Sequence, residues 1–224
     1  MPRIARVCVI DYPHHITQRG NNRESAFFDN EDREFYLKAL SRYSQQWEFD
    51  IWAYCLMTNH VHILSVPRRK ESLARGMGST NLVYTQHINR KYKRSGRLWQ
   101  NRFFSAIVED ETYLWAVVRY IERNPVRVGL VQRAEDYKWS SCKAHVSGFK
   151  DSILTGKGWL EGDNVQAYRE FLRNDDKEIE KSIRNATTTG RPLGSVSFTQ
   201  LLEKKLGRSL LPKKAGRPKK KKGE

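Results

Sequence analysis

The sequence predicts an α+β domain in which helices flank an antiparallel sheet, followed by a helical extension and a basic tail. The expected elements follow the order strand, helix, strand, strand, helix, strand, helix, which is typical of this class. Hydrophobic residues make up 38% of the chain, and ten tyrosines, nine phenylalanines and six tryptophans are sufficient for a packed core. At 224 residues the chain is long enough for one substantial domain with an appendage and short for two full domains.

The N-terminal part is expected to form a strand and then a helix. β-branched residues over 6–18 predict the strand, and Gly20 with the paired asparagines after it predicts a turn or an open loop. Asp29 is a suitable cap for the start of the helix. The buried stripe of this helix is predicted from residues at helical spacing, namely Tyr36, Leu40, Tyr43 and Trp47.

Two strands are expected next. Residues 49–57, FDIWAYCLM, are almost continuously apolar and aromatic, which is typical of a central strand buried on both faces. A short turn at Thr58 and Asn59 leads into a second strand over 60–66, which ends at Pro67. Because the first of these strands is so apolar, we expect its neighbour to be central rather than peripheral.

A helix, a strand and a second helix follow. The polar helix is expected over 71–92, where the basic run RKYKRSGR closes it, and RLWQNRFFSAIV (97–108) predicts the strand. The second helix, over 111–123, must stop near Asn124, because the residue before Pro125 disfavours the α conformation.

Beyond about residue 150 the pattern loosens into a helical appendage, in which GWLEGDN opens one helix and TGRPLGSVSFTQLLEKKLG contains another. The expected division is a main domain over 1–148, a helical extension over 149–210 and a disordered basic tail over 211–224. The tail holds seven Lys or Arg and one Glu, so the rest of the chain still carries +10 of the formal net charge of +16.

This positive charge indicates a polyanionic partner. It raises the encounter rate with polyanions, so nucleic acid or an anionic membrane surface is the first class to consider. The chain has no long apolar run, and its start, MPRIARVCVIDYPHH, does not resemble a signal peptide, which argues against the membrane. The isolated Cys8, Cys55 and Cys142 support neither a disulfide framework nor a zinc finger. Together these features predict a bacterial-type cytoplasm and a nucleic-acid substrate.

His60 and His62 in TNHVHIL form the first candidate site. Residues two apart in a strand point to the same face, about 7 Å apart along the chain. Two imidazoles at that spacing can bind one cation at about 2 Å. The alternative is a pair of surface histidines on an amphipathic strand.

Asn124 and Tyr120 form the second candidate site. Asn124 is a candidate third metal ligand, and Tyr120 lies four residues earlier on the same helix face. A phenol has a pKa of about 10, so attack at neutral pH needs a positive field or a cation that stabilises phenolate. A core aromatic is the alternative for Tyr120, and Tyr113 on the same stripe is a competing nucleophile.

Several segments are candidate DNA contacts. The stretch GRLWQNRFF combines guanidinium groups, which pair with phosphates, and aromatic faces, which stack on unpaired bases. An ordinary strand explains the same residues, but the basic run before it favours a substrate channel. The tail AGRPKKKK resembles an AT-hook without the preceding arginine, so a non-specific phosphate-binding arm is favoured. The residues expected to contact DNA are Arg19, Asn21, Arg23, Arg97, Trp99, Gln100, Arg102, Arg217, Lys219 and Lys220.

Four segments together resemble the single-tyrosine transposases of the HUH class: HHITQRGNNRESAFFDNEDREFYLKAL, WAYCLMTNHVHILSVP, GRLWQNRFFSAIV and YIERNPVRVGLV. They run in the right order from about residue 3 to about residue 148, and four linked motifs are far more specific than any one of them. The branch that the sequence resembles is the REP-associated tyrosine transposases, which are linked to repeated extragenic palindromes. The resemblance implies the ferredoxin-like HUH fold for the main domain, which would be the catalytic domain.

The resemblance also implies a role for each candidate residue. His60 and His62 match the two histidines of the HUH motif. Tyr120 matches the nucleophile four residues before the Asn-Pro step, which favours it over Tyr113. Asn124 matches the position of the third metal ligand.

The implied reaction is a transesterification of single-stranded DNA from hairpin or palindromic elements. Tyr120 would form a 5′-phosphotyrosine and release a 3′-hydroxyl without a nucleotide cofactor, in line with a sequence that has no Gly-rich phosphate loop of the Walker or dinucleotide kind. Members of the family use Mg²⁺ or Mn²⁺. Two imidazoles alone would favour Mn²⁺ or Zn²⁺, but oxygens of phosphate and water can complete the shell, so Mg²⁺ or Mn²⁺ is expected.

Two alternatives to the transposase remain open. One is a metal-dependent single-strand nuclease that uses water as the nucleophile, and the other is a catalytically idle DNA-binding regulator. The four intact site residues favour the transposase. We expect a cytoplasmic, nucleoid-associated bacterial protein that acts as a monomer or a homodimer.

Overall fold

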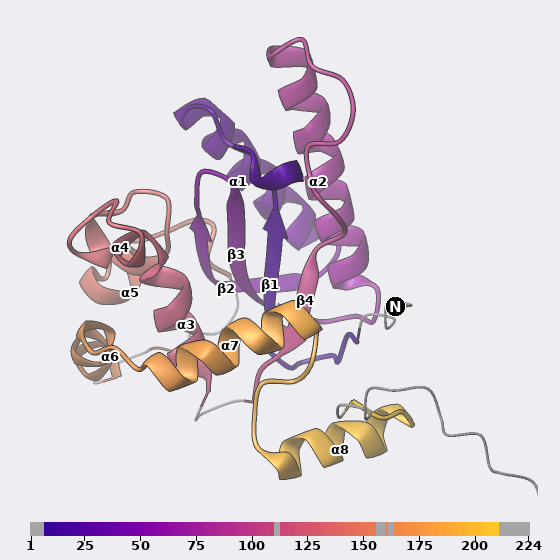
Figure 1. Ribbon diagram of the computed structural model, residues 1–224, viewed down its shortest axis with the longest axis vertical. Helices are drawn as coiled ribbons and strands as arrows, with labels where there is room; N and C mark the ends of the chain where they lie inside the picture. The colour runs from indigo at the N-terminus through magenta and orange to yellow at the C-terminus, as the bar shows by residue number, and fades with distance from the viewer. Residues whose placement is uncertain (1–6, 110–112, 156–159, 161–163, 211–224) are drawn as a thin grey trace, which may run out of the picture.

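The computed structural model describes residues 7–109, 113–155, 160 and 164–210. Within this part of the chain the core is a four-stranded antiparallel sheet in the order β2-β3-β1-β4 (Figure 1). The α+β class and the predicted order of elements are confirmed. The strands are β1 (His14–Arg19), β2 (Phe49–Leu56), β3 (His60–Pro67) and β4 (Phe104–Ile107).

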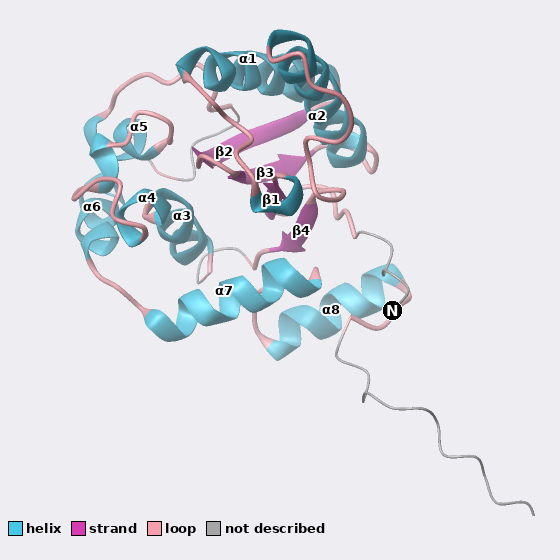
Figure 2. Cartoon of the chain, turned by 45° about the horizontal axis from the view of Figure 1, so that its top comes forward, coloured by secondary structure: helices cyan, strands magenta, loops and turns pink. Residues whose placement is uncertain are grey.

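Helices cover both faces of the sheet, so the chain forms three layers (Figure 2). Helices α1 (Asn30–Gln46) and α2 (Ser72–Lys91) pack on one face. Helices α3 (Leu114–Glu122) and α7 (Lys177–Thr189) pack on the other. None of the described helices is long and apolar enough to span a membrane. The remaining helices are η1 (Asn21–Arg23), α4 (Asn124–Arg127), η2 (Ala134–Asp136), α5 (Cys142–Ser147), α6 (Asn164–Arg173) and α8 (Val196–Leu206).

The pleat of β3 separates the two cores. Val61 and Ile63 are fully buried in the apolar cluster with α1 and α2. Leu64 belongs to the cluster with α3, and the ring of His62 lies against Tyr120 of that helix. Alternate residues of one strand therefore serve opposite layers, and the face toward α3 carries the histidines.

Strand β2 is at the edge of the sheet and not at its centre, so the predicted position of this strand is wrong. Its burial has another cause, because residues 139–141 cover its outer edge. Leu56 N donates to Trp139 O at 2.9 Å, and Ser141 N donates to Tyr54 O at 3.0 Å. The covering segment forms hydrogen bonds with backbone N–H and C=O groups at this edge, which would otherwise need water as their partner. The neighbour, β3, is central as expected.

The predicted strand over 97–108 is also wrong in its first half. Only Phe104–Ile107 forms β4, and the preceding part pairs with the chain at the end of β1 through an isolated bridge of Trp99 with Gly20, where Gln100 N donates to Arg19 O at 2.9 Å. The described part of the first strand likewise starts at His14 and not near residue 6.

The helices of the second half agree better with the sequence. Helix α3 ends at Glu122, near Asn124 as expected, but a new helical turn, α4, begins at Asn124 itself and includes Pro125. Helices α6 and α8 lie where the extension was predicted to be helical. Helices α5 and α7 were not predicted. The boundary near residue 148 stays a prediction, and α7 beyond it packs back on α3 and on the sheet (Figure 2).

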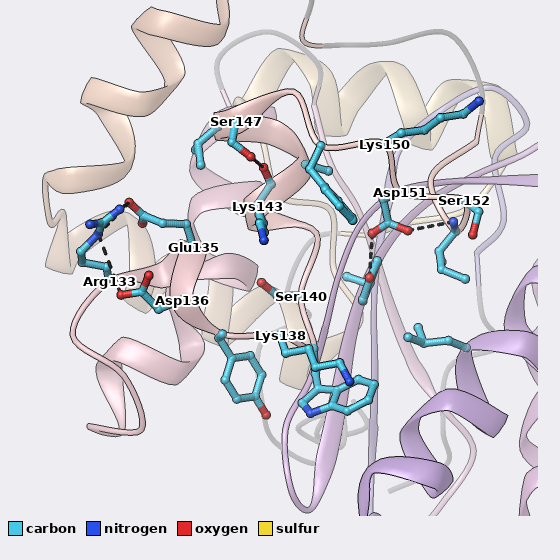
Figure 3. A pocket seen from close by; sticks show the side chains of 18 of the residues that line it. Arg133, Glu135, Asp136, Lys138, Ser140, Lys143, Ser147, Lys150, Asp151 and Ser152 are labelled. Atoms are coloured by element: carbon cyan, nitrogen blue, oxygen red, sulfur yellow. Dashed lines mark hydrogen bonds and ion pairs between the residues drawn. The ribbon is translucent and has the colours of Figure 1, made fainter.

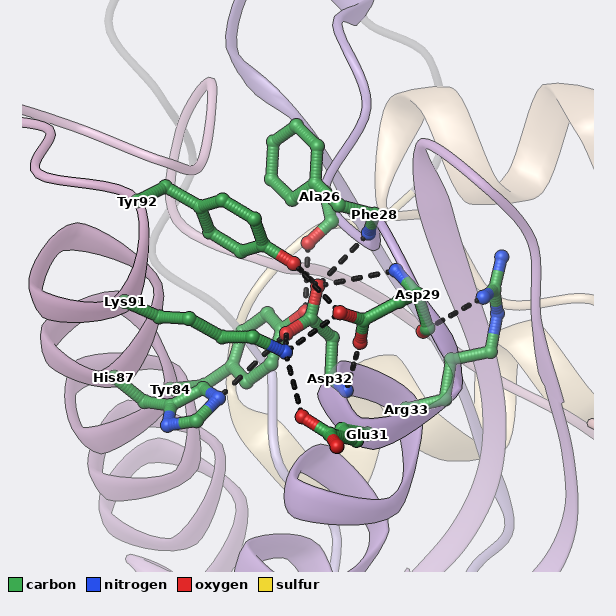
Figure 4. A network of polar contacts seen from close by, with 10 residues as sticks. All are labelled: Ala26, Phe28, Asp29, Glu31, Asp32, Arg33, Tyr84, His87, Lys91 and Tyr92. Carbon is green, nitrogen blue, oxygen red and sulfur yellow. Dashed lines mark hydrogen bonds and ion pairs between the residues drawn. The ribbon is translucent and has the colours of Figure 1, made fainter.

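A polar network joins the start of α1 to the end of α2 (Figure 4). Asp29 accepts from Asp32 N at 2.9 Å, and the Asp32 carboxylate accepts from Asp29 N at 3.3 Å, so the predicted cap is a complete capping box. Lys91 binds Asp29 at 2.6 Å and Asp32 at 3.1 Å. These charges complement the dipoles of both helices. Lys91, which is part of the basic run expected at the substrate channel, is therefore engaged in the fold.

Close packing of α2 on β2 provides a stability prediction. A Cβ added at Gly76 would overlap the buried ring of Phe49, whereas a Cβ at Gly78 would meet no atom within 4 Å. We expect Gly76→Ala to lower the free energy of unfolding by about 1–3 kcal/mol because the helix and the strand must move apart. The matched control Gly78→Ala should raise it by about 0.5–1 kcal/mol, since alanine favours the helix. Urea denaturation of the two variants measures the difference, and equal effects would contradict the packing argument.

Candidate active site

The two histidines of β3 point to the same face, as their spacing predicts. His62 pairs with Thr17 of β1 and His60 pairs with Arg19, so both lie over the sheet on the side of α3. Their ring centroids are 5.0 Å apart at an interplanar angle of 82°. His62 is buried, with 6% of its surface exposed, and His60 is half-buried.

Tyr120 on α3 faces these histidines. Its ring centroid lies 5.6 Å from that of His62, and the residue is 8% exposed. Tyr120, His60, His62 and Asn124 line one pocket of about 520 Å³. Tyr113 packs against the apolar cluster of α3 and does not line this pocket. The structure therefore brings together the four residues that the sequence singled out.

Asn124 is the first residue of α4, one turn after Tyr120. Its amide nitrogen donates to the carbonyl oxygen of Tyr120 at 2.9 Å and is 3.4 Å from that of Ile121. Because the nitrogen is bound to the backbone of α3, the oxygen Oδ1 is the atom of this side chain suited to a ligand in the pocket. An amide oxygen is an ordinary ligand for a divalent cation.

Both histidines use Nδ1 for internal hydrogen bonds. His60 Nδ1 lies 2.6 Å from Asn59 Oδ1, and His62 Nδ1 lies 2.9 Å from His15 Nε2. Burial, with the charge of Arg19 beside it, lowers the pKa of His60 to about 4. Burial also lowers the pKa of His62 well below its usual value. Both rings are therefore neutral at pH 7, the state in which imidazole binds a metal.

The donor set fits a divalent cation. Imidazole binds a cation at about 2.1 Å from its nitrogen, or about 3.2 Å from its ring centroid. Two rings whose centroids are 5.0 Å apart can therefore bind the same ion. Among the described residues no group of three or more His, Cys, Asp or Glu side chains is placed to hold a metal. Oxygens of Asn124, phosphate and water are thus the ligands that would complete a shell around His60 and His62.

Arg127 is a site residue that sequence reasoning missed. Its guanidinium lies 4.4 Å from the centroid of the Tyr120 ring, a cation–π arrangement. Glu180 of α7 holds it with two bonds, of 2.9 Å and 3.1 Å. The arginine stands in the quoted NPVRVG segment, seven residues after Tyr120, but nothing in the sequence linked it to Glu180.

Helix α7 and the start of β4 complete the pocket. The sequence did not indicate α7, whereas Phe104 of β4 is the last residue of the stretch GRLWQNRFF, which was expected to contact DNA. Arg184, Thr187 and Thr188 of α7 line the pocket. Phe104 of β4 is 40% exposed and lies at the same pocket. An exposed aromatic ring beside arginine side chains is suited to stacking on an unpaired base.

Comparison with known proteins identifies the family of the chain. Residues 8–124, or 117 of the 224, match the model of the family described as Transposase IS200 like. The chain belongs to the IS200-like transposase family. The matched region contains His60, His62, Tyr120 and Asn124, whereas Arg127 and α7 lie beyond it.

Two further similarities concern one branch of these transposases. The chain is 28% identical over 123 residues to a Haemophilus influenzae protein described as a REP-associated tyrosine transposase, an alignment that covers 50% of this chain and 67% of that protein. A solved structure of a REP-associated tyrosine transposase bound to a REP hairpin matches with a TM-score of 0.58 at 19% identity. That match covers 70% of this chain and 93% of the other, and it shows a shared fold.

Several of the predicted DNA-contacting residues of this transposase line the tyrosine pocket or the hollow beside it. Arg19 lines the pocket itself. Arg97, Gln100 and Arg102 are exposed and line an adjoining hollow of about 640 Å³, which shares Gln100 with the first pocket. Asn21 and Arg23 lie in η1, where the Asn59 amide donates to Arg23 O at 2.8 Å.

Trp99 lines the same adjoining hollow, but only 8% of it is exposed. Its ring packs against Phe27, Tyr36 and Tyr84 in the core beside α1 and α2. Its indole therefore belongs mainly to the core, and little of its surface is left to stack on a base. The predicted contacts Arg217, Lys219 and Lys220 lie outside the described residues.

A larger hollow of about 1240 Å³ lies over η2, α5 and the loop at 149–153 (Figure 3). Several of its polar groups are already engaged, since Arg133 pairs with Glu135 at 2.6 Å and Asp151 accepts from the Tyr54 hydroxyl at 2.7 Å. Its lining includes neither a histidine nor Tyr120. A choice of site by cavity volume would therefore have selected this hollow, which contains none of His60, His62, Tyr120 and Asn124 of the matched region.

Proposed function

We propose that this transposase cleaves and rejoins single-stranded hairpin or palindromic DNA through a covalent bond between Tyr120 and a 5′-phosphate. The observation that supports the proposal is the placement of Tyr120 in one pocket with His60, His62 and Asn124. A pocket of this composition offers a nucleophile, neutral imidazoles and an amide oxygen within a few ångströms of one phosphate position.

The reaction exchanges one ester for another. The phenolic oxygen of Tyr120 gives up its proton and attacks phosphorus, the bond from phosphorus to the 3′-oxygen breaks, and that oxygen takes up a proton to become a 3′-hydroxyl. Arg127 supports the step because its guanidinium, 4.4 Å from the centroid of the Tyr120 ring, attracts the phosphate to the nucleophile. A second 3′-hydroxyl can reverse the attack and join a new strand, so no nucleotide is consumed.

A divalent cation, Mg²⁺ or Mn²⁺, is part of the proposal. His60, His62 and Asn124 would hold it, and when bound it polarises a phosphate oxygen and stabilises developing negative charge. The chain itself supplies neutral ring nitrogens, since burial lowers the pKa of both histidines.

Single-stranded DNA is the proposed partner because charge and aromatic surface meet at the pocket. Phe104 is exposed at its rim, and Arg97 and Arg102 line the adjoining hollow. A relative of the same fold is described as bound to a REP hairpin, which favours a hairpin substrate. Action at the bacterial nucleoid, as a monomer or a homodimer, belongs to the same proposal.

A denaturing gel tests the reaction. Single-stranded hairpin DNA labelled at its 3′ end should give a slowly migrating band with the protein and Mn²⁺, and protease should collapse this band. DNA labelled at its 5′ end should give only a shorter free strand. Free products from both labels without an adduct would indicate the water-using nuclease, and binding without cleavage would indicate the regulator.

Arg127 provides a prediction about the nucleophile. Arg127→Ala should slow single-turnover cleavage by about 10²-fold, the usual loss when one charge-stabilising group is removed. Arg127→Lys should be intermediate, because lysine keeps a charge but cannot form the planar pair with Glu180. The matched control is Arg123→Lys, since Arg123 pairs with Asp175 at 2.6 Å and does not line the pocket. Equal losses at both arginines would refute a role for Arg127 at Tyr120.

A further inference from the structure

A third histidine, His15, lies against His62. The pairing of Thr17 with His62 places His15, two residues before Thr17, on the same face of the sheet. The rings of His15 and His62 meet edge to edge and are nearly coplanar, with centroids 5.2 Å apart and an interplanar angle of 19°. Their nitrogens His15 Nε2 and His62 Nδ1 are 2.9 Å apart. His15 is buried and does not line the pocket, so it can act on the site only through the side chains it contacts, His62 above all and also the ring of Tyr120.

The other nitrogen of His15 contacts helix α7. Thr187 Oγ1 lies 3.1 Å from His15 Nδ1 and 2.8 Å from the carbonyl oxygen of Ile183. A threonine hydroxyl has one proton to donate. When the proton goes to the Ile183 carbonyl, as is common for threonine within a helix, only a lone pair faces His15.

The direction of each hydrogen bond in the chain then follows. His15 Nδ1 must donate to Thr187, so the neutral ring has its lone pair on Nε2. His62 Nδ1 must donate to that lone pair, and the remaining nitrogen of His62, Nε2, carries a lone pair of its own. The opposite arrangement would place a proton on His62 Nε2, where it would prevent the binding of a cation.

We propose that His15, held by Thr187, is a positioning residue that keeps His62 in the Nδ1–H tautomer and so makes its Nε2 a metal ligand. The inference rests on the proposed function in one respect, because the tautomer of His62 affects the reaction only by allowing Nε2 to bind the cation. Partners of this kind commonly change metal affinity by about 10–100-fold. Thr187 lies on α7, beyond the matched residues 8–124, so the proposal gives this helix a role in positioning a metal ligand.

The tautomer can be measured without metal and without activity. In ¹⁵N–¹H correlation spectra of the imidazoles of the metal-free full-length protein, His62 should be protonated at Nδ1 and unprotonated at Nε2. In Thr187→Val, which preserves the shape of the side chain but removes the hydroxyl, His62 should populate both tautomers. Thr187→Ser should restore the single form. A wild-type His62 protonated at Nε2 would overturn the proposal.

Titration with Mn²⁺ provides the second readout. Thr187→Val and His15→Phe should each weaken Mn²⁺ binding by about 10–100-fold, and Thr187→Ser should bind as wild type does. The matched control is Thr189→Val, because Thr189 Oγ1 donates to Asn185 O at 2.7 Å on the same helix but does not contact His15. His15→Phe keeps an aromatic ring at this position but removes both nitrogens, so the test survives if one variant is unstable.

The outcomes separate this inference from the proposed function. Unchanged Mn²⁺ affinity and an unchanged tautomer in Thr187→Val would overturn the positioning role, whatever the enzyme does. A wild type that keeps the predicted tautomer but binds no Mn²⁺ would uphold the hydrogen-bond chain and refute the metal site. Equal losses in Thr187→Val and Thr189→Val would show a general effect on α7 and overturn the specific contact.

Discussion

Tyr120→Phe should reduce DNA cleavage by about 10³-fold or more, as the removal of an enzyme's nucleophile does. The substitution deletes one oxygen and keeps the ring. The ring contacts with His62 and His15, at centroid distances of 5.6 Å and 5.8 Å, therefore remain, and so does the stacking of Arg127. We expect the melting temperature and the affinity for hairpin DNA to stay close to those of wild type. Single-turnover cleavage and a gel-shift titration on the same preparation measure the two effects.

The control for this experiment is Tyr113→Phe. Tyr113 lies at the start of α3, packs against the apolar cluster and does not line the pocket. The Tyr113→Phe variant should cleave DNA at the wild-type rate and form the covalent adduct. Cleavage that persists in Tyr120→Phe, or an adduct lost only in Tyr113→Phe, would show that the nucleophile is another residue.

His62→Ala should have the second-largest effect, a loss of metal-dependent cleavage together with weaker Mn²⁺ binding. His60→Ala should act in the same direction, because the two rings are expected to bind the same ion. Burial lowers the pKa of His60 to about 4, so its protonation should not limit activity between pH 6 and pH 8 in the wild type. Calorimetric titration with Mn²⁺ and cleavage assays over a series of metal concentrations measure the two losses separately.

His87→Ala is the matched control among the histidines. His87 lies on α2, stacks on Phe35 with ring centroids 3.9 Å apart, and is not part of the pocket. It should retain both Mn²⁺ binding and cleavage. Wild-type activity in excess chelator would refute the metal site, and a metal requirement that survives both histidine substitutions would place the ion elsewhere.

Features of the fold that depend on near neighbours were predictable. Asp29 and Asp32 of the capping box are three positions apart, and α3 ends two residues before Asn124 of the Asn-Pro step. The shared face of His60 and His62 follows from the pleat of any strand. The same local geometry placed Tyr120 and Asn124 on one side of the chain, since the Asn124 amide reaches the Tyr120 carbonyl one turn earlier.

Features that depend on distant partners were not predictable. An apolar segment such as β2 can be buried by two neighbouring strands or by a covering loop, and here residues 139–141 cover it. Trp99 has the character of a base-stacking residue, but Phe27, Tyr36 and Tyr84 enclose it. The sequence pattern is the same in either case, because hydrophobicity specifies burial and not the partner.

The class of the fold and two local pairs, His60 with His62 and Tyr120 with Asn124, follow from the sequence, because strand pleat and helical turn act over a few residues. That the two pairs form one site was implied by the family resemblance, and the groups that surround them are visible only in the folded chain. Glu180 holds Arg127 across 53 residues of chain, and Thr187 reaches His15 across 172. Helix α7 carries both partners, and its own sequence does not indicate where it packs. Its site contacts depend on how the extension docks against the sheet, and docking is set by the summed packing of the folded chain.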